Sequence, residues 1–129
     1  MPAPRKILIV EDEAALLMVL ADKFRREGFN VLEAHDGLEG LRAALKHKPD
    51  LVILDIIMPS MDGLTMLKKL REDKRGNTVP VLILSNLSDP EQINEATGRG
   101  RVEYLVKSNW GLDDVVQKVI DTLETPQRR

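Results

Sequence analysis

The sequence contains no cysteine, two histidines (His35 and His47) and four aromatic residues among its 129 positions. The lack of cysteine excludes disulfides, thiolate nucleophiles, cysteine-ligated zinc and iron–sulfur clusters. Two well-separated histidines are too few for a histidine-rich metal site, and so few aromatics exclude a platform for stacking nucleic-acid bases. Any chemistry must therefore depend on carboxylates, hydroxyl groups and lysines.

The charge balance and the short hydrophobic runs argue against nucleic-acid-binding and membrane-spanning proteins. Nineteen Lys and Arg against twenty-one Asp and Glu give a net charge of −2, which argues against nucleic-acid binding through a basic footprint. The longest apolar run, Ala14–Ala21, is far shorter than the ~20 residues that span a bilayer. Without a signal-peptide pattern we expect a cytoplasmic chain. The length suits one domain, expected over residues 5–124, with loose tails at 1–4 and 125–129.

Short apolar runs typical of strands alternate with longer helical patterns along the whole chain. Five β–α units in series predict an α/β fold, with a parallel sheet covered by helices on both faces. The expected strands are Lys6–Val10, Asn30–Ala34, Leu51–Leu54, Val79–Leu84 and Val102–Val106. The expected helices are Glu13–Glu27, Leu38–Lys48, Leu64–Lys74, Asp89–Thr97 and Leu112–Leu123.

Polar side chains follow the strands where ligands bind in such sheets, at their carboxyl ends. Asp12 follows the first strand and Asp55 the third. If these strands are neighbours, two carboxylates ~4 Å apart repel by about 4 kcal/mol at an effective dielectric of ~20, unless one is protonated or a cation lies between them. Oxygen-only ligands suit Mg²⁺. Alternatively, Asp12 caps the first helix and Asp55 caps a turn.

Ser85 and Lys107 end the fourth and fifth strands. A lysine facing carboxylates and Mg²⁺ forms a pocket for a dianion such as a phosphoryl group, to which Ser85 could donate. Alternatively, Lys107 is a solvated charge and Ser85 a turn residue. Because no thiol and no useful histidine is present, the available nucleophile is a carboxylate, which can form an aspartyl phosphate.

These motifs resemble the receiver domain of two-component response regulators. The resemblance rests on residues 7–13 (ILIVEDE), residues 54–63 (LDIIMPSMDG), Ser85 and residues 104–107 (YLVK). It implies a doubly wound, flavodoxin-like parallel sheet of five strands in order 2-1-3-4-5, flanked by five helices. By this resemblance Asp55 accepts the phosphoryl group, and Ser85 and Lys107 bind it.

The same resemblance implies a metal site and a switch. Glu11, Asp12, Asp55 and the backbone carbonyl of Ile57 would hold Mg²⁺, for which Mn²⁺ could substitute. Ser85 moving toward the phosphoryl group, with Tyr104 turning inward, would be the switch. The alternative for Tyr104 is ordinary packing on a half-buried strand.

The implied partners are proteins. A sensor histidine kinase or a histidine phosphotransfer protein would supply the phosphoryl group from a phosphohistidine. A downstream target would bind the face formed by the fourth helix, fifth strand and fifth helix, on a monomer or a phosphorylation-dependent dimer. We expect neither direct nucleic-acid binding nor membrane insertion.

Four positions depart from the family pattern or stand out in it. Asn86 replaces a small residue after the hydroxyl position, and Ser108 replaces the usual proline after Lys107. Arg101 stands where the family has a small apolar residue after glycine, and Trp110 either anchors a partner or packs on the last helix. These departures bear on the lifetime of the phosphorylated state and on the fourth helix.

We therefore predict a stand-alone receiver domain that signals through protein contact and is not an enzyme. One alternative is an aspartate-nucleophile phosphatase, which Ile57 opposes because such enzymes carry a second Asp two residues after the nucleophile. Another is a phosphorylation-independent interaction module on the same fold.

Overall fold

The computed structural model describes residues 4–56, 58, 60–85, 94, 98, 100–106 and 111–124. Strands and helices alternate over residues 6–85, as the sequence pattern predicts. The strands are β1 (Lys6–Val10), β2 (Asn30–Ala34), β3 (Leu51–Leu54), β4 (Val81–Ser85) and β5 (Val102–Val106). The helices in the described part of the chain are α1 (Ala14–Arg26), α2 (Gly37–His47), α3 (Gly63–Glu72) and α5 (Leu112–Glu124).

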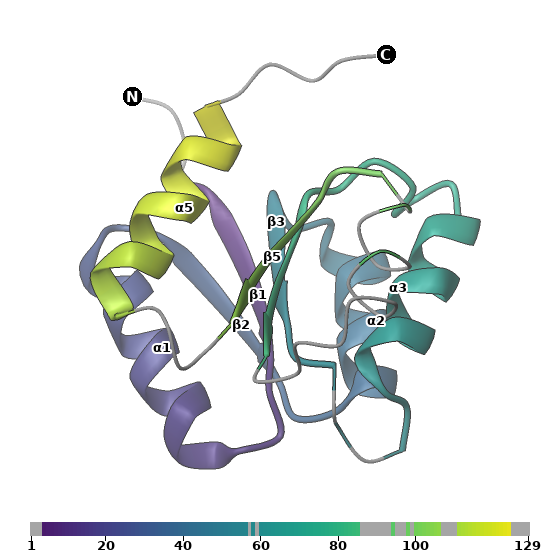
Figure 1. The fold of residues 1–129 in the computed structure, drawn as a ribbon, viewed down its shortest axis with the longest axis horizontal. Helices are drawn as coiled ribbons and strands as arrows, with labels where there is room; N and C mark the ends of the chain where they lie inside the picture. Colours follow the sequence, from purple (N-terminus) through teal and green to yellow (C-terminus); the bar gives the residue numbers. More distant parts are fainter. Residues whose placement is uncertain are drawn as a thin grey trace.

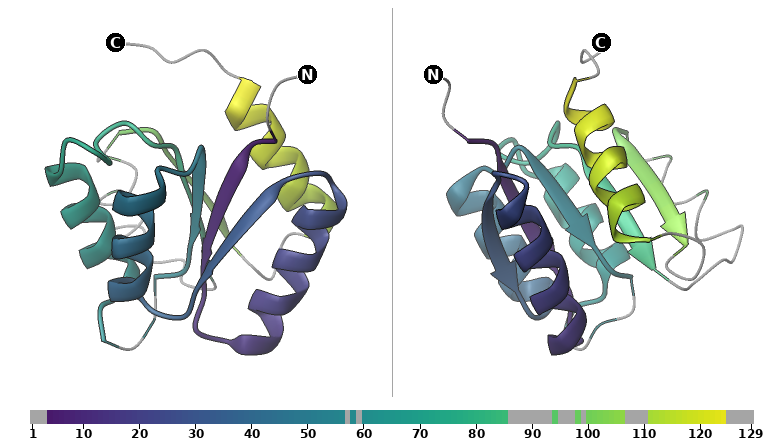
Figure 2. Two further views of the ribbon diagram at one scale, coloured as in Figure 1. Left: turned by 180° about the vertical axis from the view of Figure 1, so that it is seen from behind. Right: turned by 90° about the vertical axis from the view of Figure 1, so that its left-hand side faces the viewer.

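The five strands form one parallel sheet in the order β2-β1-β3-β4-β5, which confirms the predicted topology. Helices α1 and α5 cover one face of the sheet, and α2 and α3 cover the other (Figures 1 and 2). Val10 and Leu54 are paired at the ends of the neighbouring strands β1 and β3. The residues that follow these two strands therefore emerge side by side at one edge of the sheet.

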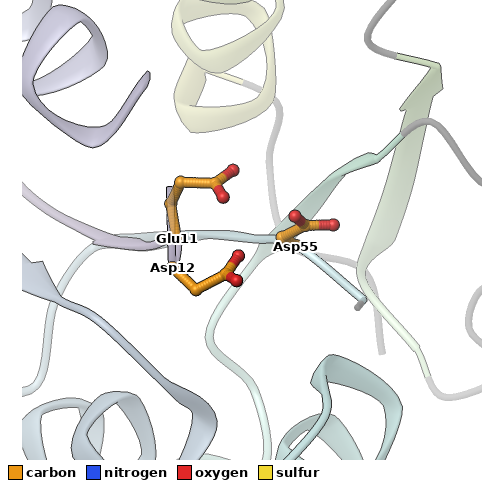
Figure 3. Close-up of side chains that lie close together, drawn as sticks. All are labelled: Glu11, Asp12 and Asp55. Atoms are coloured by element: carbon orange, nitrogen blue, oxygen red, sulfur yellow. The ribbon is translucent and has the colours of Figure 1, made fainter. Parts of the chain in front are cut away.

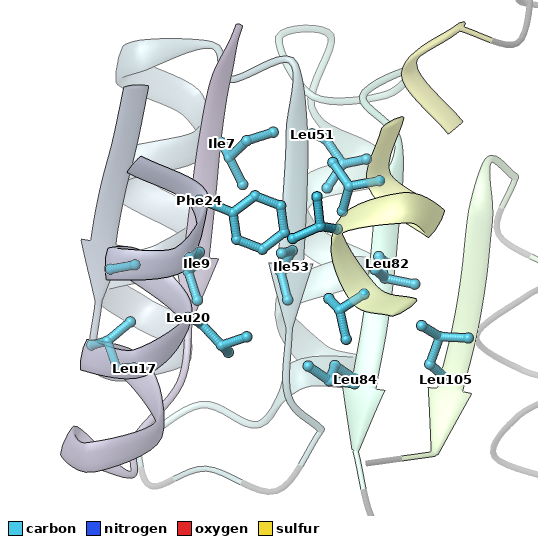
Figure 4. Close-up of a cluster of buried hydrophobic side chains, with 14 residues drawn as sticks. Ile7, Ile9, Leu17, Leu20, Phe24, Leu51, Ile53, Leu82, Leu84 and Leu105 are labelled. Atoms are coloured by element: carbon cyan, nitrogen blue, oxygen red, sulfur yellow. The ribbon is translucent and has the colours of Figure 1, made fainter. Parts of the chain in front are cut away.

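Apolar side chains on the two faces of the sheet form two separate hydrophobic cores. Every residue of β3 is buried, as expected for a central parallel strand covered on both faces. On the side of α1 and α5, Phe24 lies fully buried among strand residues such as Ile7 and Ile53 (Figure 4). On the side of α2 and α3, the core gathers Leu8, Val10 and Leu54, among others.

The helix ends follow from local sequence signals. The side chains of Asp36 and Asp62 each accept a hydrogen bond at 2.8 Å from the backbone N–H three residues on, and so cap α2 and α3. Gly28 has φ = 96°, which suits glycine, and it follows the end of α1. Helix α3 ends at Glu72, two residues before the predicted end, because Asp73 starts a turn in which the Gly76 N–H donates to the Asp73 carbonyl.

The predicted strand over Val79–Leu84 begins only at Val81, because Pro80 has no N–H to donate to the sheet, and it extends to include Ser85. The predicted fourth helix, Asp89–Thr97, lies outside the described residues except for Asn94. The described chain thus shows four helices rather than the five that we expected. None of the helices described is long and apolar enough to cross a membrane.

Candidate functional site

Three carboxylates meet at the carboxyl edge of the sheet. Glu11 and Asp12 follow β1, and Asp55 follows β3, with its N–H donating to the Val10 carbonyl at 3.2 Å. One carboxylate oxygen from each of the three lies within 4.8 Å of the others. In Figure 3 the side chains of Glu11 and Asp12 extend toward Asp55. The juxtaposition of Asp12 and Asp55 predicted from the sequence is therefore present.

Burial makes this acidic cluster electrostatically unfavourable by itself. Only 3% of Glu11 and 8% of Asp55 is exposed, whereas Asp12 is exposed to solvent. At an effective dielectric of ~20, two full negative charges at such separations repel by roughly 3–4 kcal/mol. A cation bound between the carboxylates relieves this repulsion, which favours a metal site over three separate surface charges.

The donor set fits a hard divalent cation. All three groups offer oxygen, and Mg²⁺ takes octahedral oxygen ligands at ~2.1 Å while keeping several waters. Octahedral ligands at that radius are about 3.0–4.2 Å apart. The observed spread of up to 4.8 Å is close to this range, so small side-chain rotations or a bridging water would complete the coordination.

Glu11 is held in place by the backbone around it. Its N–H donates to the Ala34 carbonyl at 3.0 Å, and its carboxylate accepts the Glu13 N–H at 3.0 Å. Glu13 is the N-cap residue of α1, and no side-chain cap bond is found there. The alternative in which Asp12 serves as the helix cap is therefore wrong, and its carboxylate instead faces the acidic cluster (Figure 3).

The start of α3 packs closely against the backbone of Asp55. The Gly63 N–H donates to the Ile56 carbonyl at 2.7 Å. A β-carbon at Gly63 would collide with the carbonyl oxygen of Asp55, and one at Gly37 would collide with that of Met61. The sequence contained no signal that Gly37, at the start of α2, packs against the backbone of Met61.

Ser85 and Tyr104 lie on the neighbouring strands β4 and β5. Ser85 is 1% exposed and pairs with Val106, and Tyr104 is half-buried beside the core of α2 and α3. Burial raises the pKa of the Tyr104 hydroxyl, a hydrogen bond with Ser85 lowers it, and the negative charge of Asp55 raises it. The structure therefore connects Asp55, Ser85 and Tyr104 electrostatically. Lys107 and Ile57, the other predicted site residues, lie outside the described residues, as do Asn86, Ser108 and Trp110.

The response regulator receiver domain family matches residues 7–120. This match covers most of the chain, so the chain belongs to the receiver domain family of two-component systems. Receiver domains are signalling domains that interact with histidine kinases or phosphotransfer proteins and with downstream targets, rather than conventional enzymes.

Individual relatives are consistent with this assignment. The chain is 36% identical over 117 residues to the transcriptional regulatory protein PdtaR of Mycobacterium tuberculosis, covering 90% of this chain and 55% of that protein. It therefore spans about half the length of this curated relative. The chemotaxis protein CheY4 of Vibrio cholerae has a similar structure, with a TM-score of 0.85, 28% identity, and coverage of 93% of this chain and 99% of that one. A CheX-CheY-BeF3-Mg²⁺ complex from Borrelia burgdorferi gives a TM-score of 0.84 at 29% identity, covering 95% and 91%.

Proposed function

We propose that this chain accepts a phosphoryl group on Asp55 from a phosphohistidine of a partner protein, in a reaction that requires Mg²⁺. The observation that carries this proposal is the position of Asp55, almost buried and within 4.8 Å of two further carboxylates at the carboxyl edge of the sheet. The partner is a sensor histidine kinase or a histidine phosphotransfer protein. Membership in the receiver family supports this choice.

In the proposed step, the bond between phosphorus and the partner's imidazole nitrogen breaks. A new bond forms between phosphorus and one carboxylate oxygen of Asp55, and the imidazole leaves with the electron pair of the broken bond. Gly63, packed against the Asp55 backbone, holds that backbone in place while this occurs. The product is an acyl phosphate on Asp55.

Glu11, Asp12 and Asp55 would hold the metal ion together with the backbone carbonyl of Ile57. Bound Mg²⁺ would neutralise negative charge on the phosphoryl oxygens, and Mn²⁺ could substitute for it. Ser85 and Lys107 would bind the phosphoryl group by hydrogen bonding and charge. The structurally similar Borrelia complex contains Mg²⁺, which supports the choice of metal.

The output we propose is a change in a protein-binding face. Tyr104 lies on β5 and is hydrogen-bonded to Ser85, so a shift of Ser85 toward a phosphoryl group would alter the position of Tyr104. This face comprises the predicted fourth helix, β5 and α5. An ion pair of 3.4 Å between Lys118 of α5 and Glu103 of β5 joins the last two elements. Action as a single-domain regulator stays a prediction, as do the cytoplasmic location and the monomer or phosphorylation-dependent dimer.

Labelling with a small phosphodonor tests the proposal. The protein is incubated with acetyl phosphate in Mg²⁺ or in EDTA, and its intact mass is measured. We expect a gain of one phosphoryl group in Mg²⁺ only, and no gain for Asp55→Asn. Asp114→Asn, which removes an exposed carboxylate on α5, is the matched control and should label like the unaltered protein.

Two other outcomes would favour the alternatives. No labelling under any condition, combined with normal folding, would indicate an interaction module that does not use phosphorylation. Continuous hydrolysis of a phosphoester substrate would instead indicate a phosphatase. Equal labelling of the Asp55→Asn variant would contradict the assignment of the acceptor.

A further inference from the structure

A polar hollow, with a volume of about 230 Å³, lies at the edge of the sheet opposite the acidic cluster. Asp50, Pro80 and Arg101 line it, and each directly precedes a strand, β3, β4 and β5 respectively. Asp55 and Ser85 lie at the other ends of β3 and β4. The hollow is therefore separated from the proposed phosphorylation site by the length of the sheet.

Cationic side chains dominate the lining of this hollow. Lys48, Arg75 and Arg101 come from three different segments of the chain, against one acid, Asp50. The Asp50 carboxylate already accepts the backbone N–H of Lys6 at 2.7 Å. Among the described residues, neither Lys48 nor Arg101 has a carboxylate within ion-pair distance. Two of the three cations thus lack a protein counter-charge in the part of the chain that is described.

Both of these cations occupy a backbone conformation that L-residues avoid. Lys48 and Arg101 each have φ = 48°, in the left-handed region where glycine and asparagine are favoured. Apart from Ser60, they are the non-glycine residues with positive φ in the described chain. Lys48 adopts this conformation as the C-cap residue of α2, and glycine at either position would be free of strain, so glycine is the substitution that removes each charge without a backbone cost.

Arg71 fixes two walls of the hollow. Its guanidinium donates to the Gly76 carbonyl at 2.9 Å and to the Gly100 carbonyl at 2.8 Å. It thereby joins the turn that carries Arg75 to the segment that carries Arg101. Burial lowers the pKa of Arg71 to about 10, with the positive charge of Arg101 acting in the same direction. Positive charge is therefore in local excess around this hollow, although the whole chain is net acidic.

We propose that this hollow binds a small phosphate-bearing anion. Arginine and lysine are the side chains that bind phosphate oxygens through charge-assisted hydrogen bonds. The volume is below the ~300–1,000 Å³ of pockets that enclose drug-sized ligands, so it suits inorganic phosphate, pyrophosphate or the terminal phosphate of a small metabolite. This site is independent of phosphoryl transfer to Asp55.

Nuclear magnetic resonance titration of the Asp55→Asn protein in EDTA tests the site without interference from the acidic cluster. Pyrophosphate, inorganic phosphate and glycerol 3-phosphate are added separately at constant ionic strength, with citrate as a non-phosphate polyanion. We expect saturable amide shifts in the segments at 48–50, 75–78 and 100–102. The phosphate compound that saturates at the lowest concentration identifies the source of the phosphate group.

Glycine variants distinguish a loss of phosphate binding from a loss of folding, because glycine adopts positive φ without strain. Arg101→Gly and Lys48→Gly remove each charge and relieve the left-handed backbone, so thermal stability should not fall. Each should weaken binding about tenfold, the effect of losing one charge-assisted hydrogen bond. Arg26→Gln, which removes an exposed cation on α1, should bind as the parent does.

Amide shifts that do not saturate with any of the three phosphate compounds would overturn the proposal. Equal affinity for citrate would also overturn it, as would unchanged phosphate affinity in both glycine variants. In each of those cases the labelling of Asp55 in the unaltered protein would be unaffected. Failure of this inference is therefore distinguishable from failure of the proposed function.

Discussion

Tyr104 and Ser85 are hydrogen-bonded between neighbouring strands, two positions out of direct register. Ser85 is paired with Val106, and Tyr104 is paired with Ile83. The charge of Asp55 also acts on the Tyr104 hydroxyl. The ionisation of Tyr104 therefore reports on both other members of the site, and Tyr104 is the only tyrosine in the chain.

Replacing Asp55 should change the pKa of Tyr104 in a defined direction. Burial is the main cause that raises this pKa above 10.0, and the Asp55 charge adds to it. Asp55→Asn should therefore lower the pKa, whereas Ser85→Ala should raise it because the hydrogen bond with Ser85 lowers it. Phenolate absorbance during a pH titration measures both effects, with Asp22→Asn on α1 as a remote acid control.

The same shift predicts how stability depends on pH. A tyrosine with a raised pKa retains its proton in the folded state after the unfolded chain has lost it. This contribution to the free energy of unfolding is complete below about pH 10 and is lost as pH rises through the folded pKa. Tyr104→Phe should reduce the alkaline loss of stability. An identical alkaline profile in both proteins would contradict the burial of this hydroxyl.

Neutralising one acid of the cluster should stabilise the protein without metal and remove its response to metal. Asp12 is exposed, so Asp12→Asn should raise the free energy of unfolding in EDTA by only about 1 kcal/mol, the repulsion expected in a water-like dielectric. Mg²⁺ should raise the melting temperature of the unaltered protein, because a ligand that binds the folded state stabilises it. The variant should show little such rise. Equal stabilisation of both proteins by Mg²⁺ would argue against Asp12 as a ligand.

Gly63→Ala should destabilise the protein and impair the acceptor loop. The added β-carbon collides with the Asp55 carbonyl and approaches the Ile56 backbone, neither of which is a flexible side chain. We expect a loss of about 2 kcal/mol, typical of overpacking, measured by urea unfolding. Gly111→Ala is the matched control, because among the described residues its β-carbon would meet only the Asp114 side chain, at 3.6 Å. Similar stabilities for the two variants would contradict the close packing at Gly63.

The turn after α3 depends on a local ion pair. Arg75 donates to Asp73 at 2.9 and 3.1 Å, and these bonds lower the pKa of Asp73 from 3.8 to about 2. Arg75→Gln should raise that pKa, which carboxyl-carbon magnetic resonance measures directly. A carboxylate with a lowered pKa contributes stability above its unfolded pKa and loses it as pH falls toward about 2. An unchanged Asp73 pKa in the variant would contradict this pairing.

Much of the fold was predictable because its strands are short apolar runs and its helices are amphipathic. The boundaries of β1, β2, β3 and β5 match the predicted ranges. The strand order was predictable only from the family resemblance, since periodicity does not say which strands pair. The predicted boundaries were wrong by two residues where a local residue sets the end of an element, at Pro80 before β4 and at Asp73 after α3.

The acidic cluster was predictable because carboxylates directly follow the first and third strands. The sequence does not say which of three consecutive acids is buried, and the structure shows that Glu11 is buried while Asp12 is exposed. The role of Arg71 was not predictable, because its acceptors, Gly76 and Gly100, belong to loops and one of them is distant in sequence.

The most direct test of the central claim locates the phosphoryl group within the chain. The protein is phosphorylated with acetyl phosphate in Mg²⁺ and then treated with borohydride, which reduces an aspartyl phosphate to homoserine. Peptide mass mapping then identifies the converted position. We predict conversion of Asp55 alone, dependent on Mg²⁺. Conversion at Asp12 or at another acid instead, or no conversion in a correctly folded protein, would contradict the account.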